Sequence, residues 1–424
     1  MRVVTAKPLT GTIAAIPAKA HAHRAFMAAA LGDEVSTFRC SRLSKDMEAT
    51  LDSLEALGAK VSRQDAQIRI EPIDGVQELG AIRPNESGTT LRLLLPIAAA
   101  IVKKTTVEAK GRLPERPLEP LLSQMKAHGV DFSEDKPPFI MKGLLQGGNF
   151  HMAGNISSQF FSGLLLAAPL YGGGRITSDT NLQSKDYVTL TEQVMADFGI
   201  TVEETMEDGK LTFTVPAHSH YGHVRDYVIE GDWSNSAVWC VAAAMTGYPL
   251  TITGVLADSV QADKRIVPLL VEAGAGVLWD NRQLLVTGQA SKPIRVDLEQ
   301  CPDLLPVLAS LALAIPGESA FVNGARLRLK ESDRLEAVAA LVKAAGGQAR
   351  LEGDNLYIRG TGQVKGGLVD CVNDHRLVMA GALLGLIAEK PMILKDSQAI
   401  AKSYPDFFDD WALIGGDSYE LTVR

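Results

Sequence analysis

The chain has 424 residues, of which 46% are hydrophobic but only 6% aromatic, and its 42 Lys and Arg against 50 Asp and Glu give a formal net charge of −8. This composition is typical of a globular protein of two or three domains, and the negative charge argues against nucleic acid or an anionic membrane surface as the main partner. Four widely spaced cysteines without a C-x-x-C motif argue against a disulfide framework or a zinc site. No apolar run has the length of a membrane helix or the form of a signal peptide, so we expect a cytoplasmic protein.

A pattern of one amphipathic helix followed by two short β-like runs recurs six times along the chain. A Gly stands between each helix and its β-like runs, where a helix ends in a left-handed residue. Successive marker glycines are 71, 70, 75, 72 and 69 residues apart. They are Gly58, Gly129, Gly199, Gly274, Gly346 and Gly415.

A second helix, apolar on nearly every side, is expected before each of these amphipathic helices. A polar or charged cluster opens each one, and the six clusters begin at Lys19, Asn85, Ser157, Glu230, Cys301 and Asn373. Such apolar helices should be buried, with the amphipathic helices packed outside them. The sequence therefore predicts an α/β (α+β) fold of six repeated units, each with an inner helix, an outer helix and a small sheet.

All six polar clusters lie at the N-terminal ends of the inner helices. Helix N-termini offer unpaired N–H groups and a partial positive charge, so six of them directed into one cleft would bind a polyanion. Ordinary N-caps are the alternative interpretation of any single cluster. Six clusters in register that also contain Lys and Arg favour the anion site.

Seven short motifs resemble those of the EPSP synthases, the 3-phosphoshikimate 1-carboxyvinyltransferase family of enolpyruvyl transferases. The motifs are Glu115-Arg116-Pro117, Ser157-Ser158-Gln159, Ser184-Lys185-Asp186-Tyr187, Pro302-Asp303, Lys330-Glu331-Ser332-Asp333-Arg334, Asn373-Asp374-His375-Arg376 and Ala401-Lys402-Ser403-Tyr404-Pro405-Asp406. The resemblance implies a two-domain inside-out α/β barrel with three units per domain. We place one domain at 17–228 and the other at 1–16 together with 229–424.

The resemblance also implies the reaction. Enolpyruvyl passes from phosphoenolpyruvate to the 5-hydroxyl of shikimate 3-phosphate through a tetrahedral ketal, with release of phosphate, in the shikimate pathway of aromatic amino acid biosynthesis. These substrates carry roughly −5 to −6 charges together. No cofactor or metal is implied, and we expect a monomer whose partners are small molecules. Seven cations of the matched motifs face those charges, namely Lys19, Arg24, Arg116, Lys330, Arg334, Arg376 and Lys402.

The family's binding residues carry over to two sets of positions. Phosphoenolpyruvate is expected to contact Lys19, Gly88, Arg116, Gln159, Arg334, Arg376 and Lys402. Shikimate 3-phosphate is expected to contact Lys19, Arg24, Ser157, Ser158, Gln159, Ser184, Tyr187, Asp303 and Lys330.

Four residues are candidates for catalysis: Lys19, Asp303, Glu331 and His375. From the residues alone, Asp303 could equally be the N-cap of an apolar helix, and Glu331 could form an ion pair on a helix surface. The resemblance makes Asp303 the proton acceptor for the 5-hydroxyl and assigns Glu331 and Lys19 to proton transfer at the methylene carbon. Which of the three moves which proton stays open, and His375 is expected to donate a hydrogen bond to phosphate.

The chain departs from the family pattern in the segment that corresponds to the family's first motif, which reads Pro17-Ala18-Lys19-Ala20-His21-Ala22-His23-Arg24. Ala20 stands where a Ser hydroxyl contacts the shikimate moiety, and Arg326 stands where Asn is common. We therefore expect weaker binding of shikimate 3-phosphate, by about 1.5–3 kcal/mol for one hydrogen bond to a charged group. Gly88 is the residue that admits the herbicide glyphosate in this family, but the altered motif leaves sensitivity open.

Three other functions are alternatives for this chain. A UDP-N-acetylglucosamine enolpyruvyl transferase would share the fold, but it usually carries a reactive Cys in its N-terminal half, and this chain has none between Cys40 and Cys240. A non-catalytic phosphometabolite-binding protein would have no need of Asp303 and Glu331 beside the cations. An RNA-end enzyme of related fold is disfavoured by the net charge.

Overall fold

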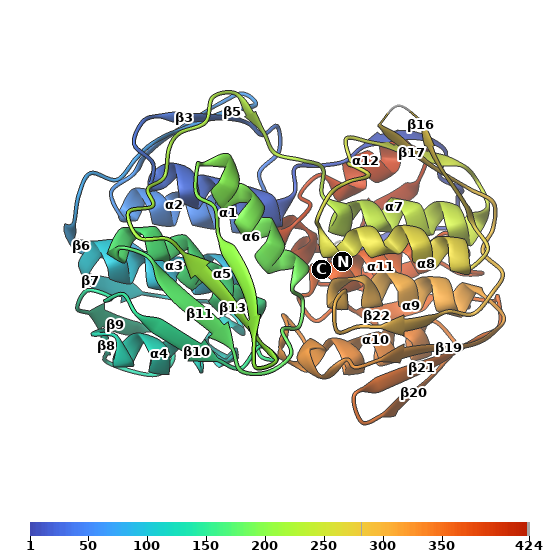
Figure 1. The fold of residues 1–424 in the computed structure, drawn as a ribbon. Coiled ribbons are helices and arrows are strands. Elements are labelled where there is room, and N and C mark those ends of the chain that lie inside the picture. The colour runs from blue at the N-terminus through green and yellow to red at the C-terminus, as the bar shows by residue number, and fades with distance from the viewer. Residues whose placement is uncertain (281, 422–424) are drawn as a thin grey trace. The chain divides into compact units, whose positions relative to one another are not determined.

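The computed structural model describes residues 1–280 and 282–421 and divides into two compact units. The N-terminal unit is Pro17–Ile229, and the C-terminal unit is Met1–Ile16 with Glu230–Arg424 (Figure 1). Each unit has its own hydrophobic core. Among the described helices, none combines the length and apolar character that a membrane span requires.

Three four-stranded sheets form the outside of the N-terminal unit. The first has the order β14 (Tyr227–Val228), β3 (Ser36–Arg39), β5 (Gln67–Glu71) and β4 (Lys60–Gln64). The second has the order β6 (Gln77–Ile82), β7 (Val102–Val107), β9 (Phe139–Lys142) and β8 (Asp131–Phe132). The third has the order β10 (Asn149–Met152), β11 (Gly174–Ser178), β13 (Lys210–Val215) and β12 (Glu203–Glu207).

The C-terminal unit repeats this arrangement with three more sheets. The first has the order β16 (Gly276–Asp280), β17 (Gln283–Thr287), β15 (Leu250–Thr253) and β2 (Gly11–Ala14). The second has the order β18 (Arg295–Asp297), β19 (Gly317–Val322), β21 (Asn355–Gly360) and β20 (Gln348–Glu352). The third has the order β22 (Gly367–Asp370), β23 (Met392–Lys395), β1 (Arg2–Thr5) and β24 (Asp417–Glu420).

Each sheet is mixed, with one parallel pair and two antiparallel pairs. The first residues of the chain join the C-terminal unit because β1 pairs antiparallel with β23 and β24, and β2 pairs parallel with β15. The chain leaves the N-terminal unit through β14, which pairs parallel with β3.

Six buried helices form the inner layer, as the apolar segments predict. They are α1 (Lys19–Ala30), α3 (Gly88–Ile101), α5 (Ser158–Ala167), α7 (Trp233–Thr246), α9 (Leu305–Ala314) and α11 (His375–Gly385). The inner helices of a unit pack on one another, α3 against α5 and α9 against α11 and α7. At Gly163 of α5 an added Cβ would lie 2.6 Å from the carbonyl oxygen of Arg92 in α3, so this crossing requires Gly.

Within the described residues, six amphipathic helices and six short 3₁₀ helices complete the units. The amphipathic helices are α2 (Lys45–Ala56), α4 (Leu121–Ala127), α6 (Asp186–Asp197), α8 (Ile266–Glu272), α10 (Arg334–Ala344) and α12 (Phe407–Leu413). The 3₁₀ helices are η1 (Leu113–Glu115), η2 (Ala168–Tyr171), η3 (Ala262–Arg265), η4 (Pro302–Leu304), η5 (Ala325–Leu329) and η6 (Ser397–Lys402). All six marker glycines have φ between 88° and 114°, as their positions after these helices predict. The predicted fold class is confirmed.

Candidate active site

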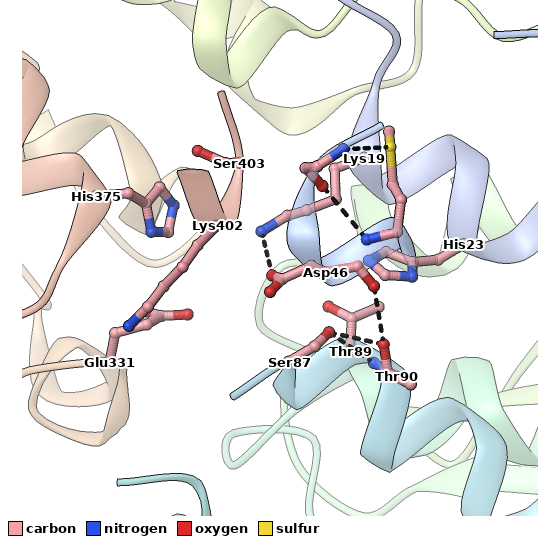
Figure 2. A network of polar contacts seen from close by, with 12 residues as sticks. Lys19, His23, Asp46, Ser87, Thr89, Thr90, Glu331, His375, Lys402 and Ser403 are labelled. Atoms are coloured by element: carbon pink, nitrogen blue, oxygen red, sulfur yellow. Dashed lines mark hydrogen bonds and ion pairs between the residues drawn. The ribbon is translucent and has the colours of Figure 1, made fainter. Parts of the chain in front are cut away.

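In the N-terminal unit, Lys19 is the first residue of α1 and forms an ion pair with a residue of α2. Its Nζ lies 2.8 Å from Oδ2 of Asp46, and the two side chains are 17% and 14% exposed (Figure 2). The pair lies at the start of α1, where the sequence predicts an anion-binding cluster. Lys19 is thus held in place by the carboxylate of Asp46, which no sequence motif identifies.

The two histidines of the first motif are buried inside the N-terminal unit. His23 Nδ1 lies 2.6 Å from Oγ1 of Thr50, and burial, together with the charges of Lys19 and Arg24, holds the pKa of His23 well below its usual value. His21 Nε2 lies 2.8 Å from the hydroxyl of Tyr227, and burial lowers the pKa of His21 to about 4. Both side chains are therefore neutral parts of the packing at pH 7.

Arg24 lies one turn further along α1, and its guanidinium bonds to oxygens of the interior. Nε donates to Oγ1 of Thr191 at 2.7 Å, and Nη2 donates to the carbonyl of Tyr187 at 3.0 Å and to Oγ of Ser162 at 3.3 Å. Nη1 donates to the carbonyl of Ala20. The residue is 1% exposed, so it joins α1 to α5 and α6. Its predicted contact with shikimate 3-phosphate stays a prediction.

Gly88 begins α3, and the guanidinium of Arg116 lies directly against it. A Cβ added at Gly88 would be 2.6 Å from Nη1 and 3.0 Å from Cζ of Arg116. Ser87 caps this helix, since its Oγ accepts a hydrogen bond from the main-chain N–H of Thr90 at 3.2 Å. The structure therefore brings Gly88 and Arg116 together at the start of α3, and a larger residue at 88 would displace Arg116.

Ser157, Ser158 and Gln159 open α5. Ser157 is the N-cap, and its Oγ accepts from the N–H of Gln159. Gln159 Oε1 accepts from Nη1 of Arg92 at 3.1 Å, and its Nε2 donates to Oγ1 of Thr89 at 2.8 Å. Gln159 thus ties the start of α5 to α3 through two residues that the sequence analysis did not select.

Ser184 and Tyr187 lie where the chain enters α6. Ser184 is buried and has φ of 55°, and its carbonyl accepts the N–H of Tyr187 at 3.2 Å. The carbonyl of Tyr187 in turn receives Arg24. Both residues are therefore linked to α1 through the main chain of this turn.

In the C-terminal unit, three carboxylates surround the guanidinium of Arg334, the first residue of α10. Nε and Nη2 donate to Asp374 at 2.8 and 3.2 Å, Nη2 also donates to Glu331 at 2.8 Å, and Nη1 donates to Asp303. Arg334 is 1% exposed. Glu331 does form an ion pair, the alternative interpretation of this residue, but its partner Arg334 is buried and does not lie on a helix surface. The charge of Arg334 is already compensated within its own unit.

Asp303 lies within η4 and caps neither that turn nor α9, so the capping alternative is wrong. Its carboxylate faces Arg334 and also Lys330, whose Nζ lies 3.3 Å away. Burial alone would raise the pKa of Asp303, but the charges of Lys330, Arg334 and Arg376 together hold it well below its usual value. The pKa of Lys330 is lowered by burial, with Arg334 and Arg326 adding to the effect and Asp303 opposing it.

His375, Arg376 and Lys402 meet around the start of α11. Asp374 is the N-cap and accepts the N–H of Arg376 at 2.9 Å, and His375 Nδ1 lies 3.8 Å from its carboxylate. Arg376 Nη1 donates to the carbonyl of Ser234 at 2.8 Å. Figure 2 shows His375 of α11, Lys402 of η6 and Glu331, which lies between η5 and α10.

The structure changes the charge count of the site. In the C-terminal unit the four predicted cations, Lys330, Arg334, Arg376 and Lys402, share the interior with four carboxylates, Asp263, Asp303, Glu331 and Asp374. Asp374 belongs to the motif Asn373-Asp374-His375-Arg376, so the sequence could have identified it as a residue of the site. Asp263 and Asp46 lie outside the motifs, and nothing in their spacing identifies them.

Comparisons with known proteins find relatives of this chain by sequence and by fold. The chain matches the family described as EPSP synthase (3-phosphoshikimate 1-carboxyvinyltransferase) over residues 3–411. A 3-phosphoshikimate 1-carboxyvinyltransferase of Clostridium kluyveri is 34% identical over 100% of both chains, and one of Methanocorpusculum labreanum is 34% identical over 99% of both. An EPSP synthase structure from Acinetobacter baumannii superposes with a TM-score of 0.79 at 20% identity, covering 99% of each chain. The protein therefore belongs to the EPSP synthase family.

Proposed function

We propose that this protein transfers the enolpyruvyl group of phosphoenolpyruvate to the 5-hydroxyl of shikimate 3-phosphate, giving 5-enolpyruvylshikimate 3-phosphate and phosphate. Membership of the family supports the proposal. The observation that carries it is the carboxylate of Asp303, held against Lys330 and Arg334. A carboxylate kept ionised beside two cations can accept a proton from a hydroxyl whose substrate also carries anionic groups.

In the addition step, the 5-hydroxyl oxygen bonds to C2 of phosphoenolpyruvate and its proton passes to Asp303. The methylene carbon C3 gains a proton, for which Lys19 and Glu331 are the candidate donors. In the elimination step, C3 returns a proton, the bond from C2 to the phosphate oxygen breaks, and phosphate leaves with the proton held by Asp303. The two steps together consume no cofactor and leave every side chain as it began.

The low pKa of Asp303 limits its strength as a base in this mechanism. In the free protein, Lys330, Arg334 and Arg376 stabilise its ionised form, which makes Asp303 a weak base. Anionic groups of bound substrates would offset that positive charge and raise the proton affinity of Asp303. The base therefore becomes effective when the anions are in place, which couples proton transfer to substrate binding.

We assign anion binding to side chains at the helix starts of each unit. In the N-terminal unit these are Lys19, Arg116 and the residues Ser157–Gln159 at the start of α5. In the C-terminal unit these are Arg376 and Lys402, which donate to main-chain carbonyls of the same unit at 2.8 and 2.7 Å. Arg334 would have to exchange one of its carboxylate partners to reach phosphoenolpyruvate.

We further propose that the two compact units are the two domains of the enzyme. The proposal extends to a monomer in the cytoplasm that acts on small molecules, with neither nucleic acid nor membrane as partner. The net charge of −8 and the separate core of each unit support it.

A phosphate-release assay tests the function. Purified protein is incubated with phosphoenolpyruvate, with shikimate 3-phosphate, or with both, and with UDP-N-acetylglucosamine in place of shikimate 3-phosphate as the control for the other enolpyruvyl transferase. We expect phosphate only when phosphoenolpyruvate and shikimate 3-phosphate are both present. Release with the UDP-sugar, or no release under any condition, contradicts the proposal.

A further inference from the structure

Asp263 is a buried carboxyl group to which the proposed mechanism assigns no step. It lies in η3 and is 1% exposed. Its Oδ2 accepts a hydrogen bond from the hydroxyl of Ser234, while its Oδ1 is buried and has no hydrogen-bond partner among the described residues. A buried carboxyl with one oxygen unsatisfied is costly, and such groups in native structures call for a specific explanation.

Ser234 connects Asp263 to a predicted anion-binding residue. Its hydroxyl binds Asp263, and its main-chain carbonyl accepts Nη1 of Arg376 at 2.8 Å. Ser234 lies in the first turn of α7, where the cap Asp232 accepts the N–H of Asn235 at 2.7 Å. The cap fixes the start of the helix, and Asp263 fixes the side chain of Ser234 within it. The main-chain carbonyl of Ser234 therefore holds Arg376, and Asp263 anchors the side chain of Ser234.

The charges that face Asp263 come from three other elements. They are Asp303 of η4, Arg376 of α11 and Asp232 at the cap of α7. On its own element, Lys264 turns its Nζ to the carbonyl of Ala257 at 3.2 Å. Burial first, and the charge of Asp303 next, raise the pKa of Asp263 to about 6, with Arg376 opposing them. The side chain therefore changes from acid to carboxylate at about pH 6.

We propose that Asp263 is a positioning residue for Arg376, acting through Ser234, in the part of the site that binds phosphoenolpyruvate. The inference rests on the proposed function for the identity of that ligand. Arg has many rotamers, and an anion is bound bidentately only when the guanidinium plane is fixed. Loss of Asp263 would release Ser234 and, with it, the anchor of Arg376.

A double-mutant cycle tests this inference. We expect Asp263→Ala and Ser234→Ala each to raise KM for phosphoenolpyruvate about 10-fold, the size of one lost hydrogen bond to a charged group. The double variant should show the same factor as either single variant, because both break one connection. Ser310→Ala is the matched control, since Ser310 is buried in the same unit and its hydroxyl donates to the carbonyl of Ala380 at 2.9 Å.

Asp263→Asn separates positioning from a general loss of packing. The amide oxygen of Asn still accepts from Ser234, so KM for phosphoenolpyruvate should stay within about 3-fold of the wild type, inside the usual spread of such contacts.

Direct binding of phosphoenolpyruvate, measured by calorimetry on the same proteins, keeps this test independent of turnover. If wild type releases no phosphate, the proposed function fails, while the binding constants still decide the role of Asp263. Folded single variants that bind phosphoenolpyruvate as wild type does would overturn the inference. Single effects that multiply in the double variant would also overturn it.

Discussion

Replacement of Gly88 by Ala should impair phosphoenolpyruvate use without harming the fold. The added Cβ would lie 2.6 Å from Nη1 of Arg116, whereas carbon contacts begin near 3.5 Å, so the guanidinium must move by about 1 Å. A misplacement of about 1 Å at a binding group can cost about 100-fold in rate, or about 2.7 kcal/mol of transition-state stabilisation. Because Gly88 lies in a helix, Ala there should keep or raise stability by up to about 1 kcal/mol.

Steady-state phosphate release measures this effect. We expect kcat/KM for phosphoenolpyruvate to fall about 100-fold in Gly88→Ala, with a urea midpoint equal to or above that of wild type. Gly222→Ala is the matched control, because its added Cβ would meet only the carbonyl of Phe198 at 3.5 Å, an ordinary contact. A folded Gly88→Ala enzyme with the kcat/KM of wild type would refute the assignment of Arg116 to this substrate.

Three further predictions concern stability and the second substrate. His21 has its pKa lowered to about 4, so the unfolded chain binds a proton that the folded His21 does not, and His21 should contribute about 3 kcal/mol to the loss of stability as pH falls from 6.5 to 4; in urea unfolding, His21→Asn should lose that much less than wild type. Asp374→Ala removes a partner of the buried Arg334 and should cost about 3–5 kcal/mol in the same assay, whereas a cost below about 1 kcal/mol would contradict the pairing. Ala20→Ser should tighten shikimate 3-phosphate binding about 10-fold in calorimetry, and an unchanged affinity would show that the missing hydroxyl does not matter.

The fold could be predicted because each repeated unit shows the same local sequence patterns at its helix ends. The end of each amphipathic helix needs a left-handed residue, so Gly58 and its five equivalents mark the period, and all six have positive φ. The starts of the inner helices follow from capping residues such as Ser87 and Asp374, which bond to the next turn of their own helix. The partners of each strand depend on contacts far apart in the chain, and the sequence did not provide them.

The site was predicted less completely, because the neighbours of its side chains also come from distant parts of the chain. The motifs identified Asp303, but its surroundings place it in η4 facing Arg334, 31 residues later, rather than at a helix cap. From the sequence, Arg24 is expected to contact shikimate 3-phosphate. In the structure its guanidinium donates to Thr191, 167 residues away, inside the unit. A count of cations along the chain cannot include the carboxylates that folding brings to them, such as Asp46 beside Lys19.

The central claim is that Asp303 accepts the proton of the 5-hydroxyl, and one measurement tests it most directly. Phosphate release with both substrates is compared between wild type and Asp303→Asn, which keeps the size of the side chain and removes its basic form. The account predicts that kcat falls by about 100- to 10,000-fold while both substrates still bind in calorimetry. A folded Asp303→Asn protein that turns over at the rate of wild type would contradict it.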